Sequence, residues 1–543
     1  MRQGVHSLYR WLDVTILDLG RQFRFSYLPP LMVYMAAGIS GLTAIVGTFF
    51  VKEHFGFPAA FLAGLTFWAG IPWALKMPLG HLVDLIWRWK AALVWLGAAL
   101  LALSIAIMYG LIAHRAAMAG VMSPEAWYVL SVILAPVGYV LQDVVADAMT
   151  VEAVPAVDHQ GRPYPEETIK SMHTTMQTLG RIAIIAGTVA VAVVNIVLFS
   201  DAGELSDDAR AAIYARIYLL ALIIPALSIL GVILAAIIRQ RRAARLRRAG
   251  VPAAEERIET HGQPTRPNWW ILGGGLAFAA VSVGLGIANV PYSQEIIFTG
   301  SMAVVLFLMA QLLRELPETL RRPLIGTAAI IFVFRATPLP GPGVEWWQID
   351  VLGFDEQFFS LLSLITAGLT LAGMLALRPL MARRTIAEVV IMLTLTAGLL
   401  SLPLIGLAYG LHEWTGRLSN GLVDARFIAV VNTALESPLG QISMIPMLAW
   451  IAKNAPAHLK ATFFAVMASF TNLALAAGSL GTRYLNEIMP ITREIRDRAT
   501  GAVSVAADYG NLGWLLIVAT VLTVALPLLA ILLVQLSRFR TAE

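Results

Sequence analysis

The chain of 543 residues is 58% hydrophobic and only 13% charged, with a mean hydropathy of +0.74. Because soluble domains carry about a quarter charged residues, this composition excludes an ordinary soluble protein and indicates an all-α integral membrane protein. The lack of cysteine excludes disulfides, thiolate catalysis and cysteine-based metal centres. The net charge of +5 indicates no nucleic-acid partner, since the basic residues lie in loops between apolar runs, where membrane topology explains them.

Apolar runs of about 18 to 25 residues recur along the chain, and this is the length that a helix needs to cross a lipid bilayer. We predict about fourteen membrane-spanning helices from these runs. They lie at 28–51, 59–80, 91–113, 126–149, 174–199, 214–238, 268–290, 295–313, 323–340, 357–377, 385–410, 425–451, 460–481 and 511–536.

The distribution of positive charge predicts the orientation of these helices. With the N-terminus in the cytoplasm, the inner loops hold about 26 Lys and Arg residues and the outer loops about 8. Loops 291–294 and 341–356 contain neither residue type and fall outside. We therefore expect a multi-pass protein of the cell inner membrane with both termini in the cytoplasm.

An internal repeat predicts the organisation of the chain. The stretch FGFPAAF after the first helix resembles LGFDEQF after the ninth, and RIAIIAGT (181–188) resembles NLALAAGS (472–479). Two parallel six-helix halves are the organisation of major facilitator transporters, here with an inserted helix pair between them. The predicted parts are a cytoplasmic segment 1–27, an N-terminal half 28–238, a basic cytoplasmic linker 239–267, the inserted pair 268–313 and a C-terminal half 323–536.

The second helix ends in a motif that is typical of a cytoplasmic gate. In IPWALKMPLGHLVDLIWRWK (71–90), Gly80, Asp84 and Arg88 form a Gly-x-x-x-Asp-…-Arg pattern that looks like the loop between helices two and three of major facilitator proteins. Gly80 allows close helix approach, and Asp84 can pair with basic residues or a helix end across a cytoplasmic gate, a contact that breaks when the transporter opens inward. The alternative is an ordinary charged turn. Trp73, beside Pro72, is suited to stacking on a flat ring or to simple packing.

Asp143 and Asp147 lie in the fourth helix at i, i+4, on one face. Charges inside a membrane are costly and need a partner or water, and paired buried carboxylates are suited to proton coupling. We expect Asp143 to pair with Arg181 of the fifth helix, on a polar stripe with Gln177. The alternative is a static salt bridge with no transport role.

In the second half, Glu436 lies in a polar helix that Pro438 interrupts and that also carries Gln441. Such a helix is suited to lining a substrate cavity. Arg335 of the ninth helix is expected to pair with Glu436 or to receive an anionic substrate. Asn472 occupies the position of Arg181 in the repeat. The alternative is a buried pair that holds this half together.

Three stretches together resemble the folate–biopterin transporter family, a branch of the major facilitator superfamily. They are residues 34–84, with an early glycine, a closing lysine and Pro-Trp followed three residues later by Lys76; DVVADAMTVE (143–152); and residues 445–478. The chain departs from the family at Met77, where proline is frequent, and at Lys460, where an acid is frequent.

The resemblance implies a secondary transporter for folate-like or pterin-like solutes, with a proton as the expected coupling ion and no cofactor. A major facilitator transporter for another organic solute is one alternative, and a non-transporting assembly factor for pigment–protein complexes is another. We expect no enzyme and no metal site, because the sequence contains no nucleophile–base set and no cluster of metal ligands.

Overall fold

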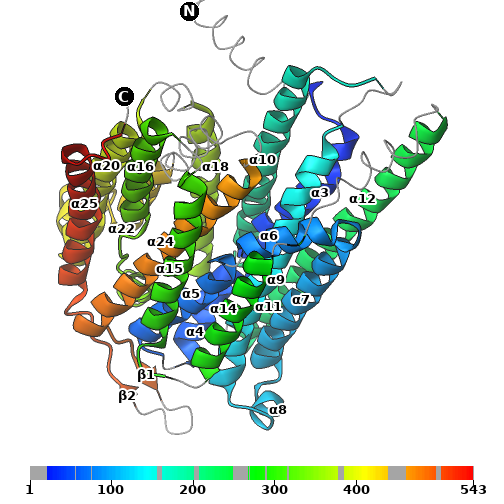
Figure 1. The fold of residues 1–543 in the computed structure, drawn as a ribbon. Helices are drawn as coiled ribbons and strands as arrows, with labels where there is room; N and C mark the ends of the chain where they lie inside the picture. The colour runs from blue at the N-terminus through cyan, green and yellow to red at the C-terminus, as the bar shows by residue number, and fades with distance from the viewer. Residues whose placement is uncertain are drawn as a thin grey trace, which may run out of the picture. The chain divides into compact units, whose positions relative to one another are not determined.

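The computed structural model describes most of the chain as helices (Figure 1). Long apolar runs fold this way because a helix satisfies its backbone hydrogen bonds within the segment, as lipid requires. The described residues are 21–541 without 56, 75, 156–161, 201–206, 249–266, 268, 288–289, 315–316, 377–383, 438–459 and 497–502.

The described helices cover every predicted span at least in part. Within the described residues, nine helices are long and apolar enough to cross a membrane. Two shorter apolar helices, Leu272–Gly286 and Ser293–Phe307, lie in the predicted insertion. These findings agree with a multi-pass, almost entirely helical membrane protein.

The chain divides into two compact units. The first comprises residues 1–44, 78–194 and 206–272. Its elements are η2 (Phe25–Tyr27), α3 (Leu28–Ile39), η3 (Ser40–Thr43), most of α6 (Lys76–Leu85), η4 (Trp87–Trp89), α7 (Ala91–Ala113), α8 (Arg115–Ala119), α9 (Pro124–Ala153), α10 (Glu166–Leu198), α11 (Asp207–Ala221) and α12 (Ile223–Arg248).

The second unit comprises residues 45–77, 195–205 and 273–543. Its elements are α4 (Ala44–His54), α5 (Ala59–Ala74), α14 (Trp269–Ile287), α15 (Ser293–Arg314), α16 (Glu318–Arg335), α17 (Gly343–Asp350), α18 (Glu356–Ala376), α20 (Ile386–Ala408), α21 (Leu411–Leu418), α22 (Ala425–Glu436), α24 (Lys460–Ile488), β1 (Ile495–Arg496), β2 (Val503–Val505) and α25 (Leu512–Leu536). The strands β1 and β2 form a short antiparallel hairpin.

The first two predicted spans each contain features that weaken a helix, and the chain passes from one unit to the other near both. The first span consists of α3, the 3₁₀ turn η3 and α4, and the unit boundary follows Ala44. The second comprises α5 and α6 and carries Pro72 and Pro78, and the boundary follows Met77. Because 3₁₀ turns and prolines weaken a helix locally, these are the points where the two spans can bend. The α4–α5 segment thus packs with the second unit, and the two six-helix halves stay a prediction.

Some predicted boundaries are wrong by several residues. The basic run after residue 238 is not a linker at its start, because α12 continues helically to Arg248. The predicted span 323–340 is displaced, since α16 ends at Arg335 and an extended loop follows it. Boundary errors of this kind arise because apolar content locates the bilayer-crossing part and not the helix ends.

Glycines allow the closest helix contacts of the first unit. A Cβ atom on Gly38 of α3 would lie 2.0 Å from the carbonyl oxygen of Ile184 on α10. On Gly97 of α7, it would lie 2.5 Å from the carbonyl oxygen of Gly138 on α9. Small residues are the usual means of close approach between membrane helices.

Two glycines that correspond in the predicted repeat each lie close to a backbone carbonyl of another segment. A Cβ atom on Gly187 of α10 would lie 2.6 Å from the carbonyl oxygen of Met35 on α3. A Cβ atom on Gly478 of α24 would lie 3.1 Å from the carbonyl oxygen of Thr337, just after α16. Gly187 therefore meets the middle of α3, whereas Gly478 meets the residues that follow α16, and the repeat stays a prediction.

We predict that Gly38→Ala lowers the stability of the protein by about 1–3 kcal/mol, because the added methyl group overlaps a backbone carbonyl that cannot move freely. The matched control is Gly300→Ala on α15, where a Cβ atom would meet nothing within 4 Å. This control should gain up to about 1 kcal/mol from helix propensity. Thermal unfolding of both variants in detergent measures the difference, and equal melting temperatures would contradict the glycine contact.

Candidate functional site

The first unit buries a tyrosine–carboxylate contact within its predicted spans. The hydroxyl of Tyr34 on α3 donates a hydrogen bond to Oδ1 of Asp147 on α9, at 2.7 Å. Tyr34 is only 7% exposed, and both aspartates, Asp143 and Asp147, are half-buried. A charge-assisted bond of this kind stabilises a carboxylate that lipid alone would not.

The helix α10 closes this cluster from the other side. A Cβ atom on Gly180 would lie 2.9 Å from the Tyr34 ring, so the glycine makes room for the aromatic side chain. Arg181 follows directly, and both Asp143 and Arg181 lie within electrostatic range of the Tyr34 hydroxyl. The expected ion pair between Asp143 and Arg181 stays a prediction, because no contact between these two side chains is described. The sequence analysis missed Tyr34, which contacts Asp147 from more than a hundred residues away.

A second charged cluster joins the start of α7, the end of α9 and the second half of α12. The Lys90 ammonium lies 2.9 Å from one oxygen of Glu152, and Arg239 Nη1 lies 3.3 Å from the other. Lys90 is 4% exposed and also lies 3.6 Å over the ring of Trp87. The acid that ends the DVVADAMTVE stretch is therefore held by two cations.

Residues 76–88 of the predicted gate motif lie in and just after α6, and the gate itself stays a prediction. Arg88 is exposed and lies 5.7 Å over the neighbouring Trp89 ring, so Lys90 is the basic residue of this stretch that makes the buried contact. A Cβ atom on Gly80 would meet nothing within 4 Å among the described residues. The close helix approach expected at this glycine stays a prediction. Lys76 lies in α6 and is half-buried. The Asp84 side chain lies outside the described part of the structure.

In the second unit, the structure brings together two predicted residues. The Asn472 side-chain amide on α24 donates to the backbone carbonyl of Trp73, at 3.2 Å. Trp73 lies in the last turn of α5, where carbonyl groups lack an intrahelical partner, and Asn472 supplies one. The Trp73 contact that the structure describes is thus made by its backbone and joins α5 to α24.

Arg335 and Glu436 end the helices α16 and α22. Arg335 is half-buried, and its Nε atom is buried without a hydrogen-bond partner among the described residues. Glu436 is exposed. Pairing between the two stays a prediction. Gln441 lies outside the described residues, and so does the side chain of Gln177 on α10.

The ion pair between Lys52 and Asp350, called the closing contact below, joins α4 to α17. The sequence analysis missed it. Lys52, at the end of α4, forms an ion pair with Asp350, whose Oδ2 also accepts the Tyr509 hydroxyl at 2.5 Å. Thr48 donates to Glu345 Oε2 at 3.4 Å. Burial and the Asp350 carboxylate raise the pKa of Tyr509 above its ordinary value, which keeps it a neutral donor. The signal in the sequence was a lysine at the end of the first span and a loop, 341–356, without any cation.

The described residues contain no group of three or more His, Asp or Glu side chains that could hold a metal ion.

Residues 37–541 match the sequence model of the BT1 family. The Folate-biopterin transporter of Synechocystis sp. (strain ATCC 27184 / PCC 6803 / Kazusa) is 25% identical over 159 residues, which cover 28% of this chain and 31% of the relative. The match thus spans about a third of that relative's length.

Solved structures show the same fold at low sequence identity. A POT family transporter in complex with 5-aminolevulinic acid aligns with a TM-score of 0.58 at 13% identity, covering 95% of this chain and 96% of that one. A mutant of the nucleoside transporter NupG aligns with a TM-score of 0.52 at 13% identity, covering 93% and 99%. These alignments confirm the predicted major facilitator fold. Each protein compared is named as a transporter and none as an enzyme, which agrees with the sequence-based expectation.

We predict that Lys52 and Asp350 are energetically coupled, by about 1 kcal/mol or less because both side chains are partly exposed. A double-mutant cycle of Lys52→Gln and Asp350→Asn, measured by unfolding in detergent, gives this coupling free energy, and added salt should reduce it.

The control cycle uses Arg417 and Glu413, an exposed pair within α21 whose coupling should be smaller still. Strict additivity of the Lys52 and Asp350 changes at low salt would contradict the closing contact.

Proposed function

Because the chain belongs to the BT1 family, we propose that it is a secondary transporter that carries a small polar organic solute across the cell inner membrane by alternating access. The observation that carries this proposal is the Tyr34–Asp147 contact, with Asp143 and Arg181 beside it, inside predicted spans. Ionisable residues at such depth are costly, and in membrane proteins they mark substrate and ion pathways.

The proposed substrate is a folate or a related pterin. The curated relative that matches part of this chain is named a folate–biopterin transporter. A pterin is a flat ring with hydrogen-bond donors on its amino-pyrimidine edge, and a carboxylate such as Asp143 or Glu436 can accept them. Folate adds carboxylates, which a guanidinium binds in a bidentate manner. Gln177, Gln441 and Asn472 are the proposed polar lining.

Arg335 is the proposed receptor for the substrate carboxylate. Its Nε atom is buried without a hydrogen-bond partner among the described residues, and a buried guanidinium donor left in this state is costly. An anionic group of the substrate would supply the missing acceptor. Arg181, which is exposed on α10, is the second candidate for this role.

Proton coupling is proposed at Asp147 and Asp143. The two carboxylates lie one helical turn apart, and two neighbouring carboxylates favour retention of one proton between them. The Tyr34 hydroxyl donates a hydrogen bond to Asp147. Breaking the Tyr34 contact as the helices move would let Asp147 take up a proton, which links protonation to conformation.

The proposed orientation has both termini in the cytoplasm. It rests on the positive charge of the inner loops and on the basic end of α12, which carries Arg245, Arg247 and Arg248 in its last turn.

We predict that Asp147→Asn abolishes accumulation of folate driven by a proton gradient in proteoliposomes, a loss of about tenfold or more. Exchange of folate at equal concentrations on both sides should persist, because exchange needs no net proton movement. The control is Glu318→Gln, which changes an exposed acid on α16. If Asp147→Asn accumulated folate at the parental rate, the proposal of proton coupling at Asp147 would be wrong. If the parent protein transported no solute, the result would favour the assembly-factor alternative.

We predict that Arg335→Ala weakens binding of folate by about tenfold or more and leaves binding of a pterin without carboxylates nearly unchanged, because only the charge-assisted bond is lost. Equilibrium binding of both ligands to purified protein measures the ratio, with Arg417→Ala as the surface control. An equal loss for the two ligands would show that Arg335 acts on the fold and not on the carboxylate.

A further inference from the structure

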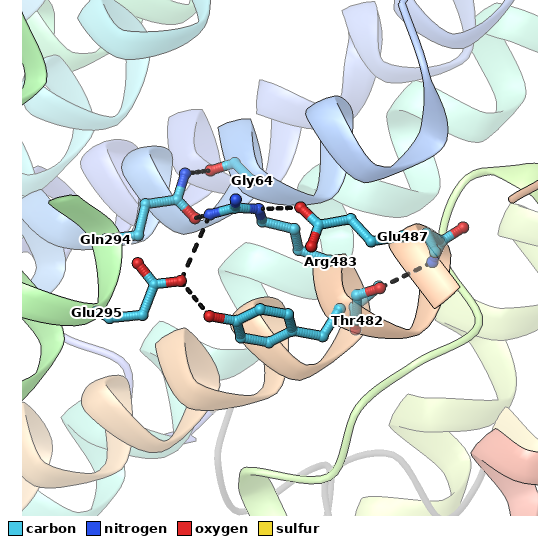
Figure 2. A network of polar contacts seen from close by, with 8 residues as sticks. Gly64, Gln294, Glu295, Thr482, Arg483 and Glu487 are labelled. Atoms are coloured by element: carbon cyan, nitrogen blue, oxygen red, sulfur yellow. Dashed lines mark hydrogen bonds and ion pairs between the residues drawn. The ribbon is translucent and has the colours of Figure 1, made fainter. Parts of the chain in front are cut away.

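The inserted helix α15 lies against two helices that the sequence assigns to different halves of the chain. Its first turn carries Gln294, which is 8% exposed and donates through Nε2 to the backbone carbonyl of Gly64 on α5, at 3.2 Å. The same side chain accepts a hydrogen bond from Arg483 Nη1 on α24, at 3.1 Å. One glutamine therefore bridges α5 and α24, as Figure 2 shows.

Arg483 is the centre of this network (Figure 2). It donates through Nε to Glu487, one turn further along α24, at 2.8 Å, and its Nη1 lies 3.6 Å from Glu295 Oε1. The neighbouring Tyr484 donates its hydroxyl to the same Glu295 oxygen. Two consecutive residues of α24 thus bind two consecutive residues of α15.

Apolar packing supports the polar contacts. Ile297 of α15, 2% exposed, lies in one cluster with Phe67 of α5 and Leu480 of α24. Phe278 and Leu285 of the other inserted helix, α14, pack against that cluster. The inserted pair therefore contributes buried surface to the junction of α5 and α24.

On the opposite face of this part of α24, two side chains bind the loop that precedes α17. Thr482 Oγ1 accepts from the backbone amide of Leu339, and Asn486 donates to the carbonyl of Pro340. This loop runs directly into α17, which carries Asp350, the partner of Lys52 on α4. Side-chain contacts therefore connect α15 to α24, α24 to the loop before α17, and α17 to α4. The chain continues from α4 into α5, which Gln294 of α15 binds.

We propose that the inserted helix pair α14–α15 is a latch: it fastens α24 to α5 on the side of the protein where Lys52 meets Asp350, and its contacts with Arg483 and Tyr484 break when that side opens. The opening rests on the proposed alternating access. The latch accounts for the two polar side chains in the first turn of this apolar helix, since α5 and α24 bind Gln294 and α24 binds Glu295.

The absence of natural cysteine allows a direct test that needs no substrate. A single cysteine replaces Val51, which is 4% exposed and lies beside Lys52. A thiol reagent modifies such a buried cysteine only when the closing contact opens, so the modification rate is proportional to the open population. We expect Arg483→Gln to raise this rate about fivefold, the effect of losing about 1 kcal/mol of latch stability. Tyr484→Phe, which removes only the Glu295 bond, should raise it less.

Two controls separate latch release from general loosening. A cysteine at Ser104, buried on α7 of the first unit, should react at the same rate with and without Arg483→Gln. Arg417→Gln, on the exposed surface of α21, should leave the rate at Val51→Cys unchanged. An unchanged Val51→Cys rate in both latch variants, or an equal increase at Ser104→Cys, would overturn the proposal. Because the readout uses no solute, a substrate other than folate would leave this test unaffected.

Discussion

The structure depends on one constraint: polar groups within lipid find no water, so each must be bound by the protein itself. The Tyr34 hydroxyl donates a hydrogen bond to Asp147, and the Asn472 amide donates one to the carbonyl of Trp73 in the last turn of α5. Glycines meet this constraint indirectly, because Gly38 and Gly187 bring α3 and α10 close enough for side chains between neighbouring helices to reach one another. These polar contacts within the spans are thus also contacts between helices, and moving those helices changes them.

The same constraint explains where movement is possible. The first span is interrupted at η3 and the second carries Pro72 and Pro78, and the unit boundaries lie close to these features. The segment between them, α4 and α5, is held by Lys52 and by Gly64. The Lys52–Asp350 pair is partly exposed and therefore of low energy, which is compatible with the opening proposed above. The core around Trp347 and Phe354, by contrast, is buried and apolar, so separating it would expose apolar surface at a cost in free energy.

The spans and the fold could be predicted from the sequence because they depend on a local property, namely the length of the apolar runs. The partners of the charged residues could not. Tyr34 contacts Asp147, and Lys52 contacts Asp350, across separations of more than a hundred residues, and nothing local to either residue indicates the other. The motif singles out Arg88, whereas the structure buries Lys90, because burial depends on the direction that each side chain takes from the turn. The role of α15 was beyond prediction because Gln294 and Glu295 resemble an ordinary polar helix start.

We propose above that this chain binds a folate-like or pterin-like solute within its membrane-spanning part. The most direct test of this proposal is equilibrium binding by the purified wild-type protein, screened against folates, pterins, nucleosides and amino-acid derivatives at two pH values. The account predicts that a folate or pterin binds most tightly and that its affinity changes with pH, as carboxylates within the spans gain or lose protons. Binding of no member of that class by correctly folded protein, or tighter binding of an unrelated solute, would contradict it.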